Sequence, residues 1–498
     1  MGLFDRFLNS VRAPAKASHG DTASPAQDAQ YLLDEGIALE QQGQREQALR
    51  RYEAAIELVP ELARAHFNRG TIWLDRGEAQ NALAAFTQAL KYKPDSAAAH
   101  YNMGNAHLRL GHPDASVVAY QQAIALKPDF VDAHVALGAA LDDLGKRDDA
   151  VTSYRRALDL QSDHAEVHHA LARTLQTLGL QDEAVVSYRR AVELNPGWVE
   201  AHGNLGNVLK DLGLFDDAIT SYRRVLAIEP ESAMGHYHLG VALHKLGQFN
   251  DAISSYRRAL EIAPHYVEAL RDQGIALHEL GKPEAAVQCY RLALETNPDM
   301  WDVNNNLAHV LKELGQLDEA IGCYRRSLAI NPDMPDVHNN LGIVLQSCGQ
   351  LDNAVASYRR TLEIKPDHAV AHNNLGTALR RLDQHQGALA SFRRALQIKP
   401  NFADAHNNLG ATFSIMGQID DSVASYRRAL EIDPDNANAH MNLGNALKDY
   451  GQIEAALISI RRALAIQSDS TVARSNLLFV YNYQSEQPAH DLLEAAKR

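Results

Sequence analysis

The chain repeats itself, because a pattern of 34 residues recurs along nearly the whole sequence. One copy, residues 335–368, reads PDVHNNLGIVLQSCGQLDNAVASYRRTLEIKPDH, and the next, residues 369–402, reads AVAHNNLGTALRRLDQHQGALASFRRALQIKPNF. Self-similarity at a fixed period of this length is the signature of a repeat architecture, in which every copy is one small structural unit. The fold therefore depends on what one such unit can form.

Each copy predicts a pair of antiparallel helices. In residues 335–368, Gly349 follows the first apolar stretch and can adopt the positive φ that ends a helix. Pro366 closes the second stretch, because proline cannot continue a helix interior. The first stretch has apolar residues at helical spacing, namely Val337, Leu341, Val344, Leu345 and Cys348. One pair cannot bury its apolar face alone, so the sequence predicts an all-α solenoid of stacked pairs.

Small residues predict a close approach between the two helices of a pair. We expect Gly342 of the first helix to face Ala354 of the second. A larger side chain there would cost about 1–3 kcal/mol by overpacking.

The unit resembles a tetratricopeptide repeat, whose pattern combines Trp, Leu-Gly, Tyr, Ala, an aromatic residue and Pro. The Trp place of that pattern is usually His here, as in His338, and the first Tyr place is usually Leu, as in Leu345. Both replacements keep a bulky side chain, and the resemblance implies a right-handed superhelical solenoid. The residues of this copy that match the pattern are Leu341, Gly342, Ala354, Tyr358 and Pro366.

Repeats account for most of the chain. We predict thirteen of them in residues 29–470, followed by a partial fourteenth repeat and a C-terminal helix in residues 471–498. Residues 1–28 do not match, and they predict a tail and linker with a short amphipathic helix. That helix is either a membrane-surface or partner-docking element, or a segment whose apolar face rests on the first repeat. Its apolar face consists of Leu3, Phe4, Phe7, Leu8 and Val11.

Charge and composition exclude several classes of protein. The net charge is −14, with 48 basic residues interleaved among 62 acidic ones, which argues against a nucleic-acid partner. No apolar run is long enough for an integral membrane segment, and the N-terminus has no adequate apolar region for a signal peptide. Cys289, Cys323 and Cys348 form no Cys-x-x-Cys pair, so we expect reduced cysteines and a cytoplasmic location.

The end of the chain has a narrower resemblance. The HNNLG and SYRRAL phrases lead into SNLLFVYNY, which is similar to the end of the repeat region in bacterial O-linked N-acetylglucosamine transferase (SPINDLY-like) proteins. The catalytic lobes of that family would begin after residue 498, so the resemblance assigns no catalytic residue and no cofactor to this chain. We expect a partner, such as a transferase domain, at the uninterrupted apolar run of Leu477, Leu478, Phe479, Val480 and Tyr481.

A row of asparagines occupies the sixth place of successive repeats. Asparagine is up to ~0.7 kcal/mol worse than Ala in a helix, so six of them cost at most roughly 4 kcal/mol, with no evident packing benefit. A carboxamide has donors and acceptors that can bracket the N–H and C=O of an extended peptide. The unbroken run is Asn306, Asn340, Asn374, Asn408, Asn442 and Asn476, and the same place holds Asn68, Asn102 and Asn204 earlier in the chain.

This row resembles the asparagine ladder with which the same transferase family holds substrate polypeptide in its superhelix. The alternative is that repeat duplication copied a tolerated surface Asn. Lys312, Arg380 and Lys448 lie just under two turns further along their helices, where they could favour acidic peptides or simply be solvated. The row is interrupted in five of the first eight repeats by Asp34, Ala136, Ala170, His238 and Asp272.

Histidine recurs at the fourth place of ten repeats, as at His338. Since we expect neighbouring repeats to be too far apart for a tetrahedral site, the sequence predicts no metal site. The histidines are instead interpreted as half-buried rings that replace Trp.

Taken together, the sequence predicts a protein-interaction scaffold that binds extended segments of partner proteins in an Asn-lined concave groove. In one hypothesis it is the substrate-recruiting repeat region of an O-linked N-acetylglucosamine transferase-like protein. In the alternative it is a free-standing tetratricopeptide adaptor unrelated to glycosylation. An enzymatic role is disfavoured, because the chain has no phosphate-cradling Gly loop and no nucleophile elbow.

Overall fold

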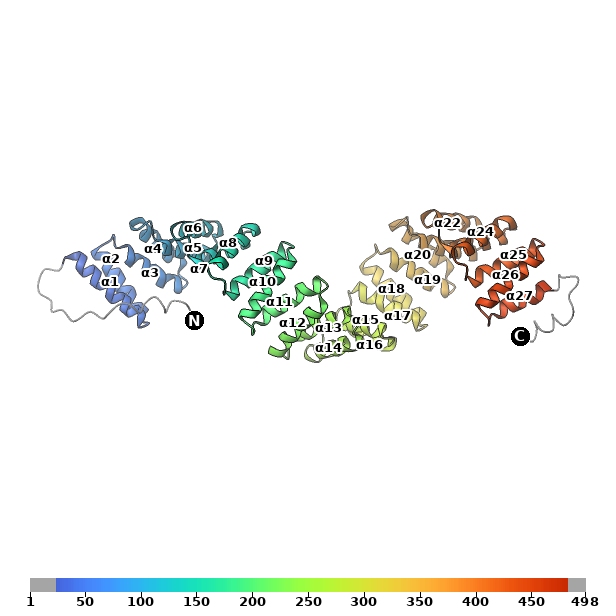
Figure 1. Cartoon of the computed structure of the whole chain (residues 1–498), viewed down its shortest axis with the longest axis horizontal. Helices are drawn as coiled ribbons and strands as arrows, with labels where there is room; N and C mark the ends of the chain where they lie inside the picture. Colours follow the sequence, from blue (N-terminus) through green and yellow to red (C-terminus); the bar gives the residue numbers. More distant parts are fainter. Residues whose placement is uncertain (1–23, 482–498) are drawn as a thin grey trace. The chain divides into compact units, whose positions relative to one another are not determined.

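The computed structural model describes residues 24–481, which form 27 α-helices and no strand. The chain divides into two compact units, Met1–Glu231 and Ser232–Arg498, both of which are built from helix pairs (Figure 1). The predicted all-α class is therefore confirmed for the described residues. The amphipathic helix predicted near the N-terminus, and the helix predicted after α27, lie outside them.

The first unit contains six helix pairs (Figure 1). Its helices are α1 (Pro25–Gln41), α2 (Arg45–Leu58), α3 (Ala63–Asp75), α4 (Ala79–Tyr92), α5 (Ala97–Arg109), α6 (Pro113–Leu126), α7 (Val131–Asp143), α8 (Arg147–Leu160), α9 (Ala165–Thr177), α10 (Gln181–Leu194), α11 (Val199–Asp211) and α12 (Phe215–Ile228). Helix α1 begins at Pro25, before the expected start of the first repeat at residue 29.

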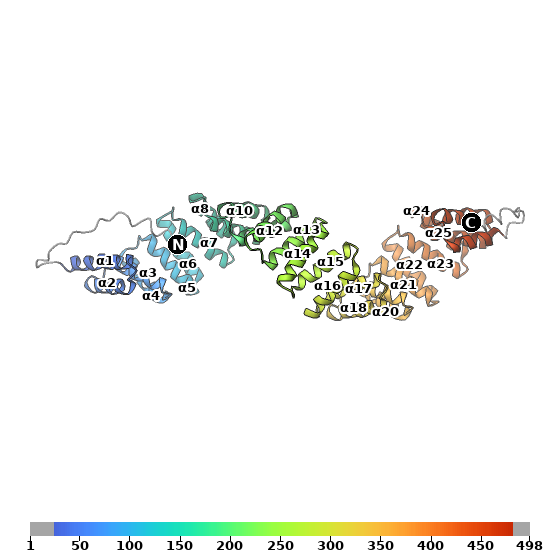
Figure 2. The same ribbon diagram turned by 90° about the horizontal axis from the view of Figure 1, so that it is seen from below.

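The second unit contains seven helix pairs and a final single helix (Figure 2). Its helices are α13 (Ala233–Lys245), α14 (Phe249–Ile262), α15 (Val267–Glu279), α16 (Pro283–Thr296), α17 (Trp301–Glu313), α18 (Leu317–Ile330), α19 (Pro335–Ser347), α20 (Leu351–Ile364), α21 (Ala369–Arg381), α22 (His385–Ile398), α23 (Ala403–Ile415), α24 (Ile419–Ile432), α25 (Ala437–Asp449), α26 (Ile453–Ile466) and α27 (Thr471–Tyr481).

Within each unit, the two helices of a pair pack on each other, and the second helix also packs on the first helix of the next pair. The turn inside a pair requires a positive φ, which glycine adopts without a steric penalty. Gly349, for example, has φ +75°. One repeat places Asp383 at this position with φ 58°, which is the only non-glycine residue with positive φ among the described residues.

The core of most pairs is a glycine facing an aromatic ring. A Cβ atom on Gly342 would lie 2.5 Å from Cε1 of Tyr358, which is fully buried. The predicted close approach at Gly342 is therefore present, but the nearest side chain is Tyr358 and not Ala354. In other pairs the glycine is replaced by a fully buried alanine, at Ala172 and Ala308, or the aromatic ring is replaced by Ile460.

The last described helix buries part of its apolar run. Val480 is fully buried and Tyr481 is 7% exposed, because both pack on the core of the preceding pair, where Nη2 of Arg461 donates a 2.8 Å hydrogen bond to the Tyr481 hydroxyl. Phe479 is exposed. The expectation of five apolar residues all awaiting a partner is therefore wrong for Val480 and Tyr481.

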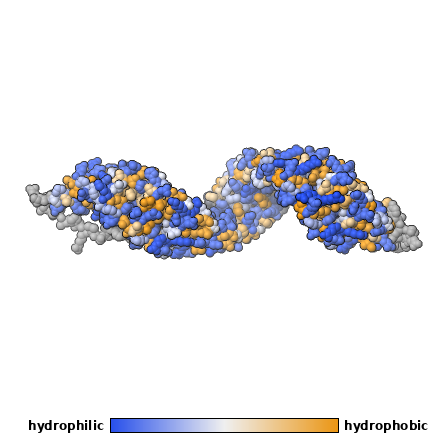
Figure 3. All heavy atoms as spheres, turned by 90° about the horizontal axis from the view of Figure 1, so that it is seen from above, coloured by the Kyte–Doolittle hydropathy of each residue, from blue (hydrophilic) through white to orange (hydrophobic). Residues whose placement is uncertain are grey.

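The surface contains both polar and apolar residues. Hydrophilic and hydrophobic residues are interspersed over the face drawn in Figure 3. Among the described helices, none is long and apolar enough to cross a membrane. Cys323 is buried and Cys289 and Cys348 are half-buried, and all three are free thiols.

We predict that Tyr358→Ala destabilises the α19–α20 pair by about 3–5 kcal/mol, because it leaves a cavity beside Gly342. The free energy of local opening, measured by amide hydrogen exchange on these two helices, checks this. Tyr358→Phe is the matched control and should cost little, since Phe86 and Phe392 fill the same place in other repeats. If the amides of α19 and α20 were equally protected from exchange in Tyr358→Ala and Tyr358→Phe, the proposed role of the Tyr358 ring would be wrong.

Candidate functional site

The sixth-place asparagines all lie on first helices and all are half-buried. Each precedes a core leucine, such as Leu341 after Asn340, so its side chain leaves the helix at the edge of the buried stripe. First helices of consecutive repeats contact each other at most steps of the second unit, as α19 does with α21 and α21 with α23. The six carboxamides of the unbroken run therefore come from neighbouring helices: Asn306 (α17), Asn340 (α19), Asn374 (α21), Asn408 (α23), Asn442 (α25) and Asn476 (α27).

Three of these asparagines hydrogen-bond to the preceding repeat. The Nδ2 amides of Asn374, Asn408 and Asn442 each donate a 3.0 Å hydrogen bond to the Oδ1 of a fifth-place asparagine. We call these three bonds the carboxamide rungs, and their acceptors are Asn339, Asn373 and Asn407. A hydrogen bond contributes about 0.5–1.5 kcal/mol net, which offsets the ~0.7 kcal/mol helix penalty of an asparagine. The expectation that the row has no packing benefit is therefore wrong at these places.

The same connection recurs with other side chains. The amide of Asn204 donates to Nε2 of His169 over 3.1 Å. At one of the interruptions, the hydroxyl of Tyr237 donates to Oδ2 of Asp272 over 3.0 Å. A bond between the fifth place of one repeat and the sixth place of the next is thus a general feature of the array.

Two members of the unbroken run differ. Within residues 24–481, the side chains of Asn340 and Asn476 have no hydrogen-bond partner. Asn306 accepts only a long bond of 3.5 Å from its neighbour Asn305. In the first unit, Asn102 accepts a 3.4 Å bond from Asn105. Two carboxamides of the run therefore make no hydrogen bond to the described part of the chain.

The fifth-place asparagines are partners in the contacts between repeats that the sequence analysis missed. Asn339 is 6% exposed and Asn373 is 8% exposed, so their amides are buried and need partners. The sequence signal for these contacts was the pair of consecutive asparagines in the HNNLG phrase. The first asparagine accepts a hydrogen bond from the next repeat, and the second donates one to the preceding repeat.

Of the three cations near the row, Arg380 is half-buried and has no carboxylate within ion-pair distance among the described residues. Its Nη2 lies 3.5 Å from Oδ1 of Asn408, and burial lowers the pKa of the guanidinium. Lys448 pairs with Asp449 and lies over the ring of Phe479. Arg380 thus presents an uncompensated positive charge beside the carboxamide of Asn408.

The fourth-place histidines connect each repeat to the end of the one before it. His66 donates from Nε2 to the carbonyl oxygen of Pro60 over 2.9 Å. Asn304 makes the related bond to Pro298 over 3.5 Å. The half-buried rings are therefore inter-repeat hydrogen-bond donors. The other histidines that make this bond, all at 3.0–3.1 Å, are His100, His134, His168, His202, His338, His372, His406 and His440.

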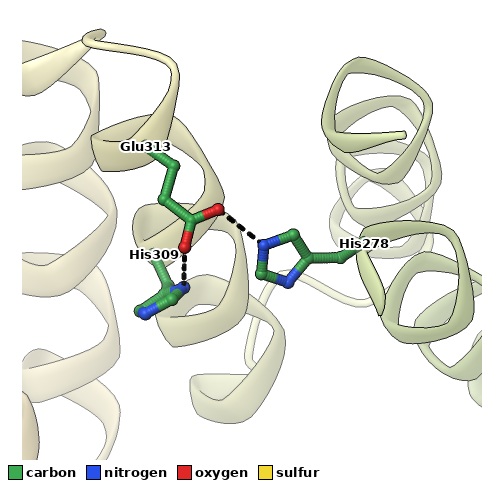
Figure 4. Close-up of side chains that lie close together, drawn as sticks. All are labelled: His278, His309 and Glu313. Atoms are coloured by element: carbon green, nitrogen blue, oxygen red, sulfur yellow. Dashed lines mark hydrogen bonds and ion pairs between the residues drawn. The ribbon is translucent and has the colours of Figure 1, made fainter. Parts of the chain in front are cut away.

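His278, His309 and Glu313 come together from two neighbouring repeats (Figure 4). His278 extends from α15 toward Glu313 on α17, and His309 lies one turn before Glu313 on the same helix. Their donor atoms all lie within 4.8 Å of one another. The distance argument made for the fourth-place histidines does not extend to this cluster, because its long side chains span the distance between the helix axes.

Models of the family described as tetratricopeptide repeat match most of the chain. They match residues 33–97, 97–130, 135–197, 204–267, 245–300, 289–322, 333–401, 391–424 and 437–470. A model described as TPR repeat matches residues 308–347 and 413–451. No curated protein matches the sequence.

Solved structures with a similar fold include MamA and the APC/C hetero-tetramer Cut9–Hcn1. One MamA crystal structure is 25% identical, with 32% of this chain and 95% of that chain covered and a TM-score of 0.32. A second MamA structure is 24% identical, with 34% and 93% covered and a TM-score of 0.33. Cut9–Hcn1 is 17% identical, with 92% and 98% covered and a TM-score of 0.40.

We predict that the protein loses stability as the pH falls below 6.5. Burial, as the largest cause, lowers the pKa of five fourth-place histidines from its ordinary value of 6.5. Below pH 6.5 the unfolded chain therefore binds more protons than the folded one. The histidines contribute their full stabilisation above pH 6.5, and the free energy of unfolding declines as the pH drops toward the lowered pKa values. The five are His66, His168, His202, His372 and His406.

Melting temperatures at pH 7.5 and 5.5 measure this effect. Glutamine also carries an N–H donor but does not titrate, so a variant with all five histidines changed to Gln should lose less stability over the same range. An equal loss in the variant and the unmodified chain would show that other groups cause the pH dependence.

Proposed function

The chain belongs to the tetratricopeptide repeat family, and from that premise we propose that it is a scaffold for protein–protein interaction. The proposed ligand is an extended polypeptide segment of a partner protein. It lies along the first helices, on the face that carries the sixth-place asparagines. Solenoids of this kind offer extended concave surfaces to their partners, which supports a scaffold role.

The chemistry of the row supports recognition of a polypeptide backbone. Asn374 uses one of its two amide hydrogens in a carboxamide rung, so the other hydrogen and the oxygen remain. Helices that pack roughly 8–10 Å apart present about one carboxamide for every three residues of an extended chain, which rises about 3.3 Å per residue. If the carboxamides contact only the backbone of the bound peptide, the site would bind peptides of many different sequences.

The observation that carries the proposal is the pair of carboxamides at Asn340 and Asn476, which have no partner within residues 24–481 and belong to a row of half-buried asparagines. Arg380 adds a preference, because its charge lies beside Asn408 without an acidic partner in the described part of the chain. The segment that this surface favours is therefore extended and carries an acidic residue near Asn408.

A more specific proposal is that the chain is the substrate-recruiting repeat region of a protein similar to bacterial O-linked N-acetylglucosamine transferases, acting in the cytoplasm. The asparagine row and the SNLLFVYNY segment support it. None of the families or structures named above is a glycosyltransferase, so this part depends on the sequence resemblance. We propose no catalytic activity for the chain itself.

The alternative is a free-standing adaptor unrelated to glycosylation. One observation favours it: the carboxamide rungs give Asn374, Asn408 and Asn442 a structural role that requires no ligand. Under this alternative the chain still binds proteins, but the asparagines mainly connect its repeats.

We predict that Asn340→Ala combined with Asn476→Ala weakens peptide binding roughly 5- to 150-fold. The loss of two hydrogen bonds of about 0.5–1.5 kcal/mol each gives this range. The probes are unstructured 15-residue peptides selected from a random library on the full chain, and fluorescence anisotropy measures their affinity. The variant should fold normally, because neither side chain has a partner within residues 24–481.

A triple variant with Asn339, Asn373 and Asn407 changed to Ala is the matched control. It removes the rung acceptors, lowers stability and leaves every sixth-place carboxamide in place. Because the rungs orient three carboxamides but contribute none, its affinity should fall less than that of the double variant. The proposal is wrong if the double variant binds as tightly as the unmodified chain, or if no peptide is selected.

We predict that a photo-crosslinking residue in place of Phe479, which is 50% exposed, captures a glycosyltransferase domain in the cells that produce the chain. Mass spectrometry identifies the captured protein. The same residue in place of Tyr31, which is 62% exposed at the other end of the array, is the control. Capture of other proteins alone would support the adaptor alternative.

A further inference from the structure

We propose that His278, His309 and Glu313 form a binding site for a divalent transition-metal cation, with Zn²⁺ as the best fit. The site joins two neighbouring repeats through α15 and α17 (Figure 4). Two of its residues, His309 and Glu313, lie on the same face of α17 as Asn306, three and seven residues further along the helix. The metal proposal does not depend on the function proposed above.

The distances bring three donors close to the arrangement that zinc requires. Oε2 of Glu313 lies 2.7 Å from Nε2 of His278, and Oε1 of Glu313 lies 3.5 Å from Nδ1 of His309. Zinc bonds of about 2.0–2.1 Å at tetrahedral angles place neighbouring donors roughly 3.4 Å apart. A small rotation of the Glu313 carboxylate therefore makes room for a cation among the three groups.

The donor types select the class of metal. Two imidazole nitrogens and one carboxylate form a three-ligand set that zinc accepts with water in the fourth position. Calcium and magnesium take oxygen ligands and do not suit a site with two imidazoles. A cation bound to Nε2 of His278 would take the place of the hydrogen that this nitrogen now donates to Glu313, and the single hydrogen of the neutral ring would then lie on Nδ1. Protonation of the ligands in acid would compete with the cation.

The side chains of His278 and His309 are 28% and 44% exposed, so a cation can reach the site from solvent.

One repeat earlier, the chain has a similar His–Glu pair that lacks the third potential metal ligand. His244 lies 2.6 Å from Glu279, in the same geometry as His278 and Glu313. The place that corresponds to His309 is Ile275, so the earlier pair has no third donor. His309 is thus the residue that turns a repeated hydrogen bond into a set of three metal ligands.

The test is isothermal titration calorimetry of ZnCl₂ into the full chain at pH 7.5, after treatment with a chelator. We expect one zinc site whose affinity falls at least tenfold in His309→Gln and in Glu313→Gln. The control His244→Gln breaks the comparable pair and should leave the zinc affinity unchanged. Circular dichroism checks that each variant is folded, and Co²⁺ as a second probe should give the visible absorption of a four-coordinate site.

Three results would overturn the proposal. The first is an absence of saturable zinc binding, which would make the cluster an ordinary hydrogen-bonded contact between repeats. The second is zinc binding that His309→Gln and Glu313→Gln leave unchanged, which would place the metal on other histidines or cysteines. The third is an equal loss of affinity in His244→Gln and His309→Gln.

Discussion

A helix pair with an apolar stripe on each helix cannot bury both stripes by itself, and every other feature of this protein depends on that constraint. In most pairs a glycine packs against an aromatic ring, as Gly342 does against Tyr358. The remaining apolar surface is covered by the next pair. The polar contacts between repeats then determine how one pair meets the next, through the fourth-place histidines and the fifth- and sixth-place asparagines.

The inter-repeat contacts and the proposed binding surface involve the same side chains. An asparagine such as Asn408 donates to the preceding repeat and lies beside the unpaired charge of Arg380. The orientation of this side chain is therefore fixed before a ligand binds, which reduces the conformational entropy that the side chain loses on binding. Asn340 and Asn476 have no such restraint within the described residues, so they can adapt to the ligand.

Much of this fold could be predicted from the sequence, because the period of the repeat, its glycines and its prolines each have a local physical meaning. The errors concern contacts between elements. The identity of the group facing Gly342 depends on the rotation of one helix against the other, and the burial of Val480 depends on the preceding pair. The row of asparagines was identified from its spacing, but the rungs and the cluster around Glu313 required the reach of side chains across repeats.

The carboxamide rungs all have the same direction: in each, the later repeat donates and the earlier repeat accepts. The row therefore has a sense along its length, much as a strand does in a sheet. A polypeptide backbone also differs from its own reverse, because its N–H and C=O groups follow in a fixed order. A segment aligned with the row and the same segment inverted would meet different sets of donors and acceptors, so a peptide that binds as proposed would have one preferred direction.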